Sequence, residues 1–141
     1  MKKSTGELLD TMKRQSSFSS YAAFVSDNFV EENAPHIALN ALMKEKHLKK
    51  SDVIKDSGLN RTYAYDILSG RKTPTRDKIL MLCLAMQLSM DETQRLLYIS
   101  GYPQLYAKIK RESAILFALE KHLSVMETNH LLDEMEDEIL E

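Results

Sequence analysis

LKKSDVIKDSGLNRTYAYDILSGRKTP, residues 48–74, contains two short amphipathic segments separated by a glycine. The first segment predicts a helix over about Lys50–Ser57, and Gly58 follows it, where glycine adopts a left-handed backbone at the lowest cost. A second helix is expected over about Asn60–Ser69, because asparagine is a preferred capping residue and Gly70 can end the helix. The stretch therefore predicts two short helices that cross at a tight turn.

The sequence on either side predicts three more helices. One opens at Asn33-Ala-Pro35, because a proline in the first turn costs no hydrogen bond, and runs to about His47. Another is expected over Arg76–Gln87, and the third follows the capping box Ser89-Met-Asp-Glu92 and ends at Gly101. Residues 33–102 are thus expected to form a unit of five helices.

As an ordered set, these features resemble the lambda-repressor/Cro-like (XRE) helix-turn-helix family of bacterial and phage regulators. The matching positions are Leu48, Val53, Gly58, Leu59, Asn60, Ala64, Ile67, Gly70 and Pro74. The two helices after Pro74 correspond to the family's closing hairpin, so the resemblance covers about half of the chain. One departure lies at Lys49 and Lys50, where the family usually has Thr-Gln. Two lysines keep a positive charge for phosphate but remove the side-chain cap of the helix.

The resemblance implies that the helix opened by Asn60 is a recognition helix that enters the major groove of double-stranded DNA. The base-reading side chains would be Arg61, Thr62, Tyr65 and Asp66. Arginine suits O6 and N7 of guanine, threonine a thymine methyl or a phosphate, and aspartate a cytosine amino group. The phosphate-binding residues would be Lys49, Lys50, Asn60, Arg71 and Lys72. The implied function is sequence-specific DNA binding by a transcriptional regulator.

The same helix allows an interpretation without DNA. Tyr63 and Tyr65 could pack against neighbouring helices, and Asp66 could pair with Arg61 or Arg71. Some members of the family bind other proteins through this fold. The alternative function is therefore a protein-binding adaptor or antitoxin-like module.

Charge is distributed unevenly along the chain, although the net charge is only −2. Residues 44–78 hold ten Lys or Arg and five acids, whereas residues 112–141 hold nine acids and one Lys. A protein that binds a polyanion needs a local basic face rather than a basic total, and residues 44–78 supply one. Two solvated surfaces of opposite sign would give the same pattern.

A repeat follows the five predicted helices. Leu88–Leu97 and Leu123–Leu132 are identical at six of ten positions, 35 residues apart, and Arg76-Asp77 aligns with Arg111-Glu112 at the same spacing. This predicts two copies of one helical hairpin, each with its second helix opening at a serine cap. Chance similarity between capped amphipathic hairpins is the other interpretation. Beyond Leu132 the acidic chain is expected to fray, unless Met135, Ile139 and Leu140 continue the helix.

The predicted fold class is all-α: an N-terminal helical extension over 1–32, a lambda-repressor-like five-helix DNA-binding domain over 33–102, and a C-terminal helical hairpin with an acidic tail over 103–141. In the extension, Ser4-Thr-Gly-Glu7 fits a capping box, and apolar residues recur at helical spacing from Phe18 to Phe29. A homodimer, or a protein partner, is expected through the N- or C-terminal helices. These apolar faces could instead cover each other or the core within one chain.

No pattern in the sequence indicates a catalytic site, a metal, a cofactor, a signal peptide or a membrane span, so we expect a non-enzymatic cytoplasmic protein. The residues considered as metal ligands, which lack the required spacing, are His36, His47, His122, His130 and Cys83. The resemblance implies a buried core position for Cys83. Tyr98, Tyr102 and Tyr106 are expected to pack at a junction between hairpins.

Overall fold

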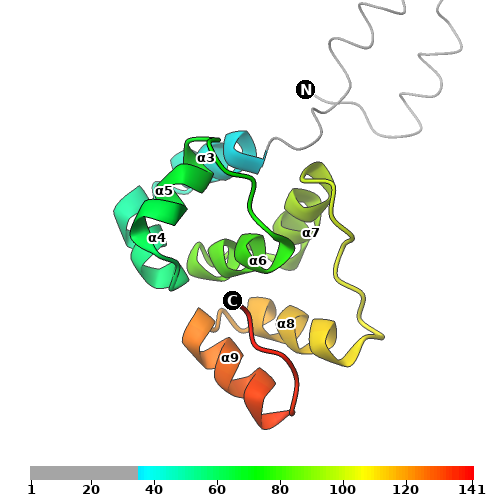
Figure 1. Cartoon of the computed structure of the whole chain (residues 1–141). Helices are drawn as coiled ribbons and strands as arrows, with labels where there is room; N and C mark the ends of the chain where they lie inside the picture. Colours follow the sequence, from blue (N-terminus) through cyan, green and yellow to red (C-terminus); the bar gives the residue numbers. More distant parts are fainter. Residues whose placement is uncertain (1–34) are drawn as a thin grey trace, which may run out of the picture. The chain divides into compact units, whose positions relative to one another are not determined.

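In the structure, a computed structural model, residues 35–141 are described; the extension predicted for residues 1–32 lies outside the described residues. The helices are α3 (Pro35–Glu45), α4 (Lys50–Ser57), α5 (Arg61–Leu68), α6 (Arg76–Ala85), α7 (Met90–Ile99), α8 (Lys110–Glu120) and α9 (Val125–Glu134) (Figure 1). Residues 35–141 contain no strand, so the all-α prediction is confirmed. No helix in this range is long and apolar enough to cross a membrane.

The helix-turn-helix forms as the sequence predicts. Gly58 ends α4 with a φ of 74°, and the side chain of Asn60 caps α5 by accepting a hydrogen bond from the Tyr63 amide at 3.1 Å. The ends of α3 and α6 differ from the prediction, because both helices stop two residues early. There His47 and Gln87 adopt φ values of 56° and 53°, which reverse the chain although neither is glycine.

Helix α5 is held against α3 at its carboxyl end. The side-chain amide of Asn40 donates to the Leu68 carbonyl at 2.8 Å, across the gap between the two helices. Gly70 follows with a φ of 83°, and a Cβ there would lie 2.9 Å from Nε2 of His36. Another residue would require the His36 ring to move and would strain the left-handed backbone, so glycine is favoured at this position.

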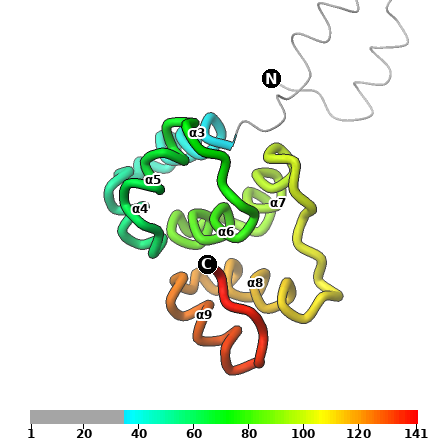
Figure 2. Tube along the Cα trace, in the orientation of Figure 1, coloured from blue at the N-terminus to red at the C-terminus, as the bar shows by residue number. Residues whose placement is uncertain are grey.

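The hydrophobic core extends through all seven described helices. Helix α6 lies at its centre, with Ile79, Leu80 and Leu82 fully buried, and contacts α4, α7 and α9 (Figure 2). Cys83 is also fully buried, as predicted. Of the three tyrosines expected to pack at a junction, only Tyr102 does so, donating from its hydroxyl to the Pro74 carbonyl at 2.6 Å. The expectation was wrong for Tyr98 and Tyr106, which are mainly exposed.

The predicted hairpin repeat is confirmed. Helices α7 and α9 both open with a complete capping box, at Ser89 with Glu92 and at Ser124 with Glu127. The segment after each hairpin is held in the same way, because a side-chain amide on the second helix bonds both backbone groups of a buried leucine. These pairs are Gln94 with Leu105 and Asn129 with Leu140.

The C-terminal residues were predicted to fray or to continue a helix, and both predictions are wrong. Helix α9 ends at Glu134, and the chain then runs back along the hairpin as an extended strap, drawn in red in Figure 1. Arg111 donates to the carbonyl of Glu138 at 2.9 Å, and Leu140 is 1% exposed. The strap stays in place because it buries an apolar side chain and satisfies backbone groups, despite its many acids.

The two hairpins interlock through a reciprocal pair of salt bridges. Arg76 of the first contacts Glu112 of the second at 2.9 Å, and Arg111 of the second contacts Asp77 of the first at 2.9 Å. Likewise α6 contacts α9 and α7 contacts α8. If α6 and α7 are exchanged with α8 and α9, the contact of α6 with α9 becomes that of α8 with α7. The two hairpins therefore contact each other symmetrically, as across a two-fold axis.

Candidate nucleic-acid interface

The two helices of the helix-turn-helix each bury one face and expose the other. Val53 and Ile54 of α4 and Ala64 and Ile67 of α5 are at most 4% exposed, because they pack into the shared core. Leu68 is buried as well, whereas the exposed residues of α5 lie on its outer face, where a helix of this length can enter a groove about 12 Å wide. Arg61, Thr62 and Tyr65 are exposed on that outer face.

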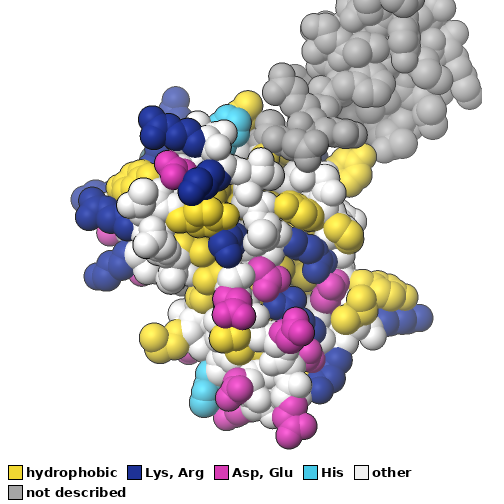
Figure 3. Space-filling model, viewed as in Figure 1, with side chains coloured by type: hydrophobic (Ala, Val, Ile, Leu, Met, Phe, Trp, Pro, Cys, Tyr) yellow, Lys and Arg dark blue, Asp and Glu magenta, His cyan; other side chains and the backbone are white. Residues whose placement is uncertain are grey.

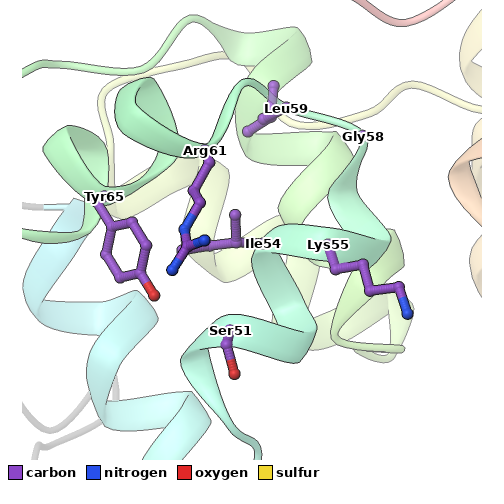
Figure 4. A pocket seen from close by; sticks show the side chains of 7 residues that line it. All are labelled: Ser51, Ile54, Lys55, Gly58, Leu59, Arg61 and Tyr65. Carbon is purple, nitrogen blue, oxygen red and sulfur yellow. The ribbon is translucent and has the colours of Figure 1, made fainter.

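Arg61 and Tyr65 lie side by side at the edge of a hollow of about 430 Å³ between α4 and α5 (Figure 4). The guanidinium carbon of Arg61 is 5.8 Å from the centre of the Tyr65 ring, within the range of a cation–π interaction. Ile54 lies behind the two side chains, and Lys55 extends away from them. Among residues 35–141, Arg61 forms no salt bridge, so its charge is free for a ligand.

Asp66 has different surroundings from the other predicted base-reading residues. It is half-buried, and its carboxylate lies 3.9 Å from Arg71 Nη1 and 3.8 Å from Lys72 Nζ. Its backbone carbonyl also accepts hydrogen bonds from the amides of both residues. The structure thus shows the pairing with Arg71 considered above, and places Asp66 among the cations predicted to bind phosphate.

The predicted phosphate-binding residues lie at both ends of the helix-turn-helix. Lys49 and Lys50 are exposed at the start of α4, where Lys49 occupies the capping position without a side-chain hydrogen bond, as its departure from the family pattern predicts. Arg71 and Lys72 are exposed after α5. The Asn60 side-chain oxygen is engaged in capping α5, which leaves its amide nitrogen as the group for phosphate.

Sequence reasoning missed three residues of this surface. Ser51 and Lys55, one turn apart on the exposed face of α4, line the hollow beside Arg61. Their four-residue spacing could have identified them, because residues i and i+4 share a helix face. Lys78 was also missed; its ammonium and that of Lys72 lie 5.5 and 5.2 Å from the centre of the Tyr63 ring.

Charge divides the described part of the molecule into two regions. In the view of Figure 3, Lys and Arg side chains gather over α4 and α5, and Asp and Glu side chains lie over α8, α9 and the C-terminal strap. The basic region coincides with the exposed face of the helix-turn-helix. An anionic ligand is therefore attracted to α4 and α5 and repelled by the hairpin of α8 and α9.

Other kinds of site find no support in the part of the chain that the structure covers. No group of three or more His, Cys, Asp or Glu side chains is placed there to hold a metal ion. Burial raises the pKa of the Cys83 thiol to about 12, so it stays protonated at neutral pH. A protonated, buried thiol is neither a nucleophile nor a metal ligand.

Comparison with known proteins points to the same region. Residues 38–92 match the Cro/C1-type HTH DNA-binding domain. The chain is similar to the ImmF control region 10 kDa protein of Bacillus phage phi105, with 35% identity over 48 residues, which are 34% of this chain and 53% of that protein. The chain thus spans about half the length of this relative. No solved structure gives a significant match.

Proposed function

Because residues 38–92 of this chain belong to the Cro/C1-type helix-turn-helix family, we propose that the protein binds double-stranded DNA sequence-specifically and acts as a transcriptional regulator. In this proposal α5 enters the major groove, and Arg61, Thr62 and Tyr65 contact base edges. Lys49, Lys50, Asn60, Arg71 and Lys72 bind phosphates on either side.

The observation that carries the proposal is the exposed guanidinium of Arg61 at the start of α5, which pairs with no carboxylate of residues 35–141. In the proposed complex this guanidinium faces the bases from the first turn of α5, and it is flanked by the exposed cations at the start of α4 and after α5. A fold used only to bind proteins has no need of a cation-rich face around an unpaired arginine. This favours DNA binding over the adaptor alternative.

The regulatory part of the proposal is supported by the relative in phage phi105, whose name refers to a control region. A DNA-binding protein of this kind works where the genome is, so we propose a cytoplasmic location. We also retain the proposed division into a DNA-binding domain over 33–102 and a C-terminal hairpin over 103–141.

A homodimer remains part of the proposal. One recognition helix covers only a few base pairs, whereas two copies can read half-sites about 34 Å apart. The hairpin of α8 and α9 offers a surface for a second copy, because a hollow of about 350 Å³ opens on it, lined by Phe117, Leu131 and Met135 among others. Phe117 lines this hollow and is 51% exposed. A protruding ring and a hollow thus lie on the same face, so in a two-fold dimer the Phe117 of each copy could enter the hollow of the other.

The test compares Arg61→Ala with Lys50→Ala in the full-length protein, against a specific site and a scrambled one. We expect Arg61→Ala to weaken binding to the specific site by about 1–3 kcal/mol and to relax preference at one base position. Lys50→Ala should weaken binding to both DNAs equally. It should also reduce, by about one unit, the slope of the logarithm of the association constant against the logarithm of salt concentration. Equal losses on both DNAs for Arg61→Ala would make it a phosphate contact and contradict its base-reading role.

A further inference from the structure

The hollow between α4 and α5 has a mainly apolar lining, and at its edge stands Arg61, which forms no salt bridge with any of residues 35–141. Ile54, 4% exposed, and the half-buried Leu59 line it together with Gly58 and the ring of Tyr65. Arg61 stands at the opening beside that ring (Figure 4). A ligand of this site must therefore bring an apolar group and a hydrogen-bond acceptor within a few ångströms of each other.

A phosphate does not fit this description. Seated in the hollow, it would lose hydration against Ile54 and Leu59, which offer no hydrogen bond in return. Lys55, the second cation among the lining residues, extends away from Arg61 in Figure 4. A phosphodiester could pair with Arg61 at the opening, but its charged oxygens gain nothing from the apolar lining, so a phosphate is not the preferred occupant of the hollow.

A thymine followed by a guanine does fit. Thymine is the unmodified DNA base that presents a methyl group in the major groove, and guanine presents O6 and N7 as two acceptors for arginine. We propose that the hollow takes the 5-methyl group of a thymine while Arg61 binds the guanine that follows it on the same strand, so that Arg61 and Tyr65 together read a thymine–guanine step. This inference rests on the proposed function, and it gives that function a definite base preference.

Tyr65 has a specific part in this reading. Its ring holds the guanidinium of Arg61 from one side and forms one wall of the hollow, so it contacts the methyl group through carbon atoms. The phenol hydroxyl is not needed for either contact. Tyr65→Phe should therefore preserve the preference for thymine, and Tyr65→Ala should remove it.

The experiment first selects sites from random double-stranded DNA with the full-length protein, then replaces the thymine before the conserved guanine by deoxyuridine, which lacks only the methyl. We expect the dissociation constant to rise about threefold to fourfold, the factor for removing one methyl group from an apolar contact. A second comparison places 5-methylcytosine in one site and cytosine in another at the position of that thymine. The dissociation constant should be lower for the 5-methylcytosine site than for the cytosine site, by a similar factor.

Variants assign the effect to the hollow. Tyr65→Ala should bind the thymine and deoxyuridine sites equally, whereas Tyr63→Phe, altered on the ring that faces Lys72 and Lys78, should keep the difference. The inference is overturned if the selected site has no thymine–guanine step, if wild type binds both sites equally, or if Tyr65→Ala keeps the difference. If no sequence is enriched at all, the proposed function itself fails, and that outcome is distinct from the other three.

Discussion

Arg61 and Asp66 lie on the same short helix but in opposite electrostatic situations. Arg61 has no carboxylate within salt-bridge distance among residues 35–141, while Asp66 has two cations within 4 Å. Five residues separate them, which places them on different sides of α5. Positive charge on α5 is therefore available to a ligand at its first turn, and negative charge is partly neutralised at its last.

This difference gives a prediction for Asp66→Asn. Removing the carboxylate frees Arg71 and Lys72 for phosphate, so nonspecific DNA binding should tighten by about twofold to fivefold, the range of a surface ion pair. Fluorescence anisotropy with scrambled DNA measures the change. If Asp66 instead reads a cytosine, as the family resemblance implies, affinity will fall for the selected site and its base preference will change at one position.

A second residue-scale prediction concerns Cys83. Its thiol is completely buried, and burial raises its pKa to about 12. A thiol reagent at pH 8 should therefore react only after global unfolding, at a rate that follows the opening of the core. Rapid reaction of the native protein would contradict the placement of Cys83 in the core.

At the scale of elements, the start of α4 is less well capped than the start of α5. Lys49 sits at the capping position and makes no side-chain hydrogen bond, whereas Asn60 caps α5. Lys49→Ser should supply the missing acceptor and raise the free energy of unfolding by about 0.5–2 kcal/mol. Lys50→Ser, one residue later, is the control and should give no gain. Urea denaturation of both variants measures the difference.

Helix starts were predictable from sequence and helix ends were less so, for a physical reason. Serine at 89 and 124 and asparagine at 60 carry side-chain acceptors that bond the first free amides, so residue type alone indicates a start. The turns at His47 and Gln87 use left-handed residues that are not glycine. They are imposed by the burial of the apolar residues that follow, which is a tertiary effect.

The site shows the same division between local and tertiary information. The family resemblance predicts Arg61, Thr62 and Tyr65 on the outer face of α5, and all three are exposed. The pairing of Asp66 depends on how the loop after Gly70 folds back, and the hollow depends on the crossing of α4 and α5. The ordered course of the C-terminal strap was not predicted, because its acidic composition indicates a solvated tail and only one of its residues, Leu140, is deeply buried.

At the scale of the whole molecule, the reciprocal salt bridges join the first hairpin, α6 and α7, to the second hairpin, α8 and α9. Burial alone would raise the pKa of Glu112, but hydrogen bonds from Arg76 and from the Tyr106 amide hold it below its usual value. A carboxyl with a lowered folded-state pKa stabilises the fold above its unfolded-state pKa of about 4.3. This stabilisation is lost as pH falls through the lower folded-state pKa.

Glu112→Gln should therefore lower the free energy of unfolding at pH 7 by about 1–3 kcal/mol, because it weakens charge-assisted hydrogen bonds. It should also make the loss of stability below pH 5 shallower than in wild type. Glu120→Gln, on an exposed position of the same helix, is the control. An unchanged pH profile in Glu112→Gln would show that the salt bridge with Arg76 does not hold the hairpins together.

The dimer is tested by sedimentation at micromolar concentration. We expect the wild-type protein to dimerise. Phe117→Ser should shift the equilibrium toward monomer, because the substitution removes the exposed aromatic ring at the hollow of α8 and α9. Met126→Ser, at an 82% exposed position outside that hollow, is the matched control. A strict monomer that binds one half-site as tightly as a palindrome would exclude the dimer.

The salt dependence of DNA binding tests the central claim most directly. The four cations Lys49, Lys50, Arg71 and Lys72 lie where the proposal places phosphates, so each should release counterions on binding. The logarithm of the association constant should then fall with the logarithm of salt concentration at a slope of about −3 to −4, measured with the full-length protein on its selected site. Binding that does not respond to salt, or no DNA binding at about 50 mM salt, would contradict the account.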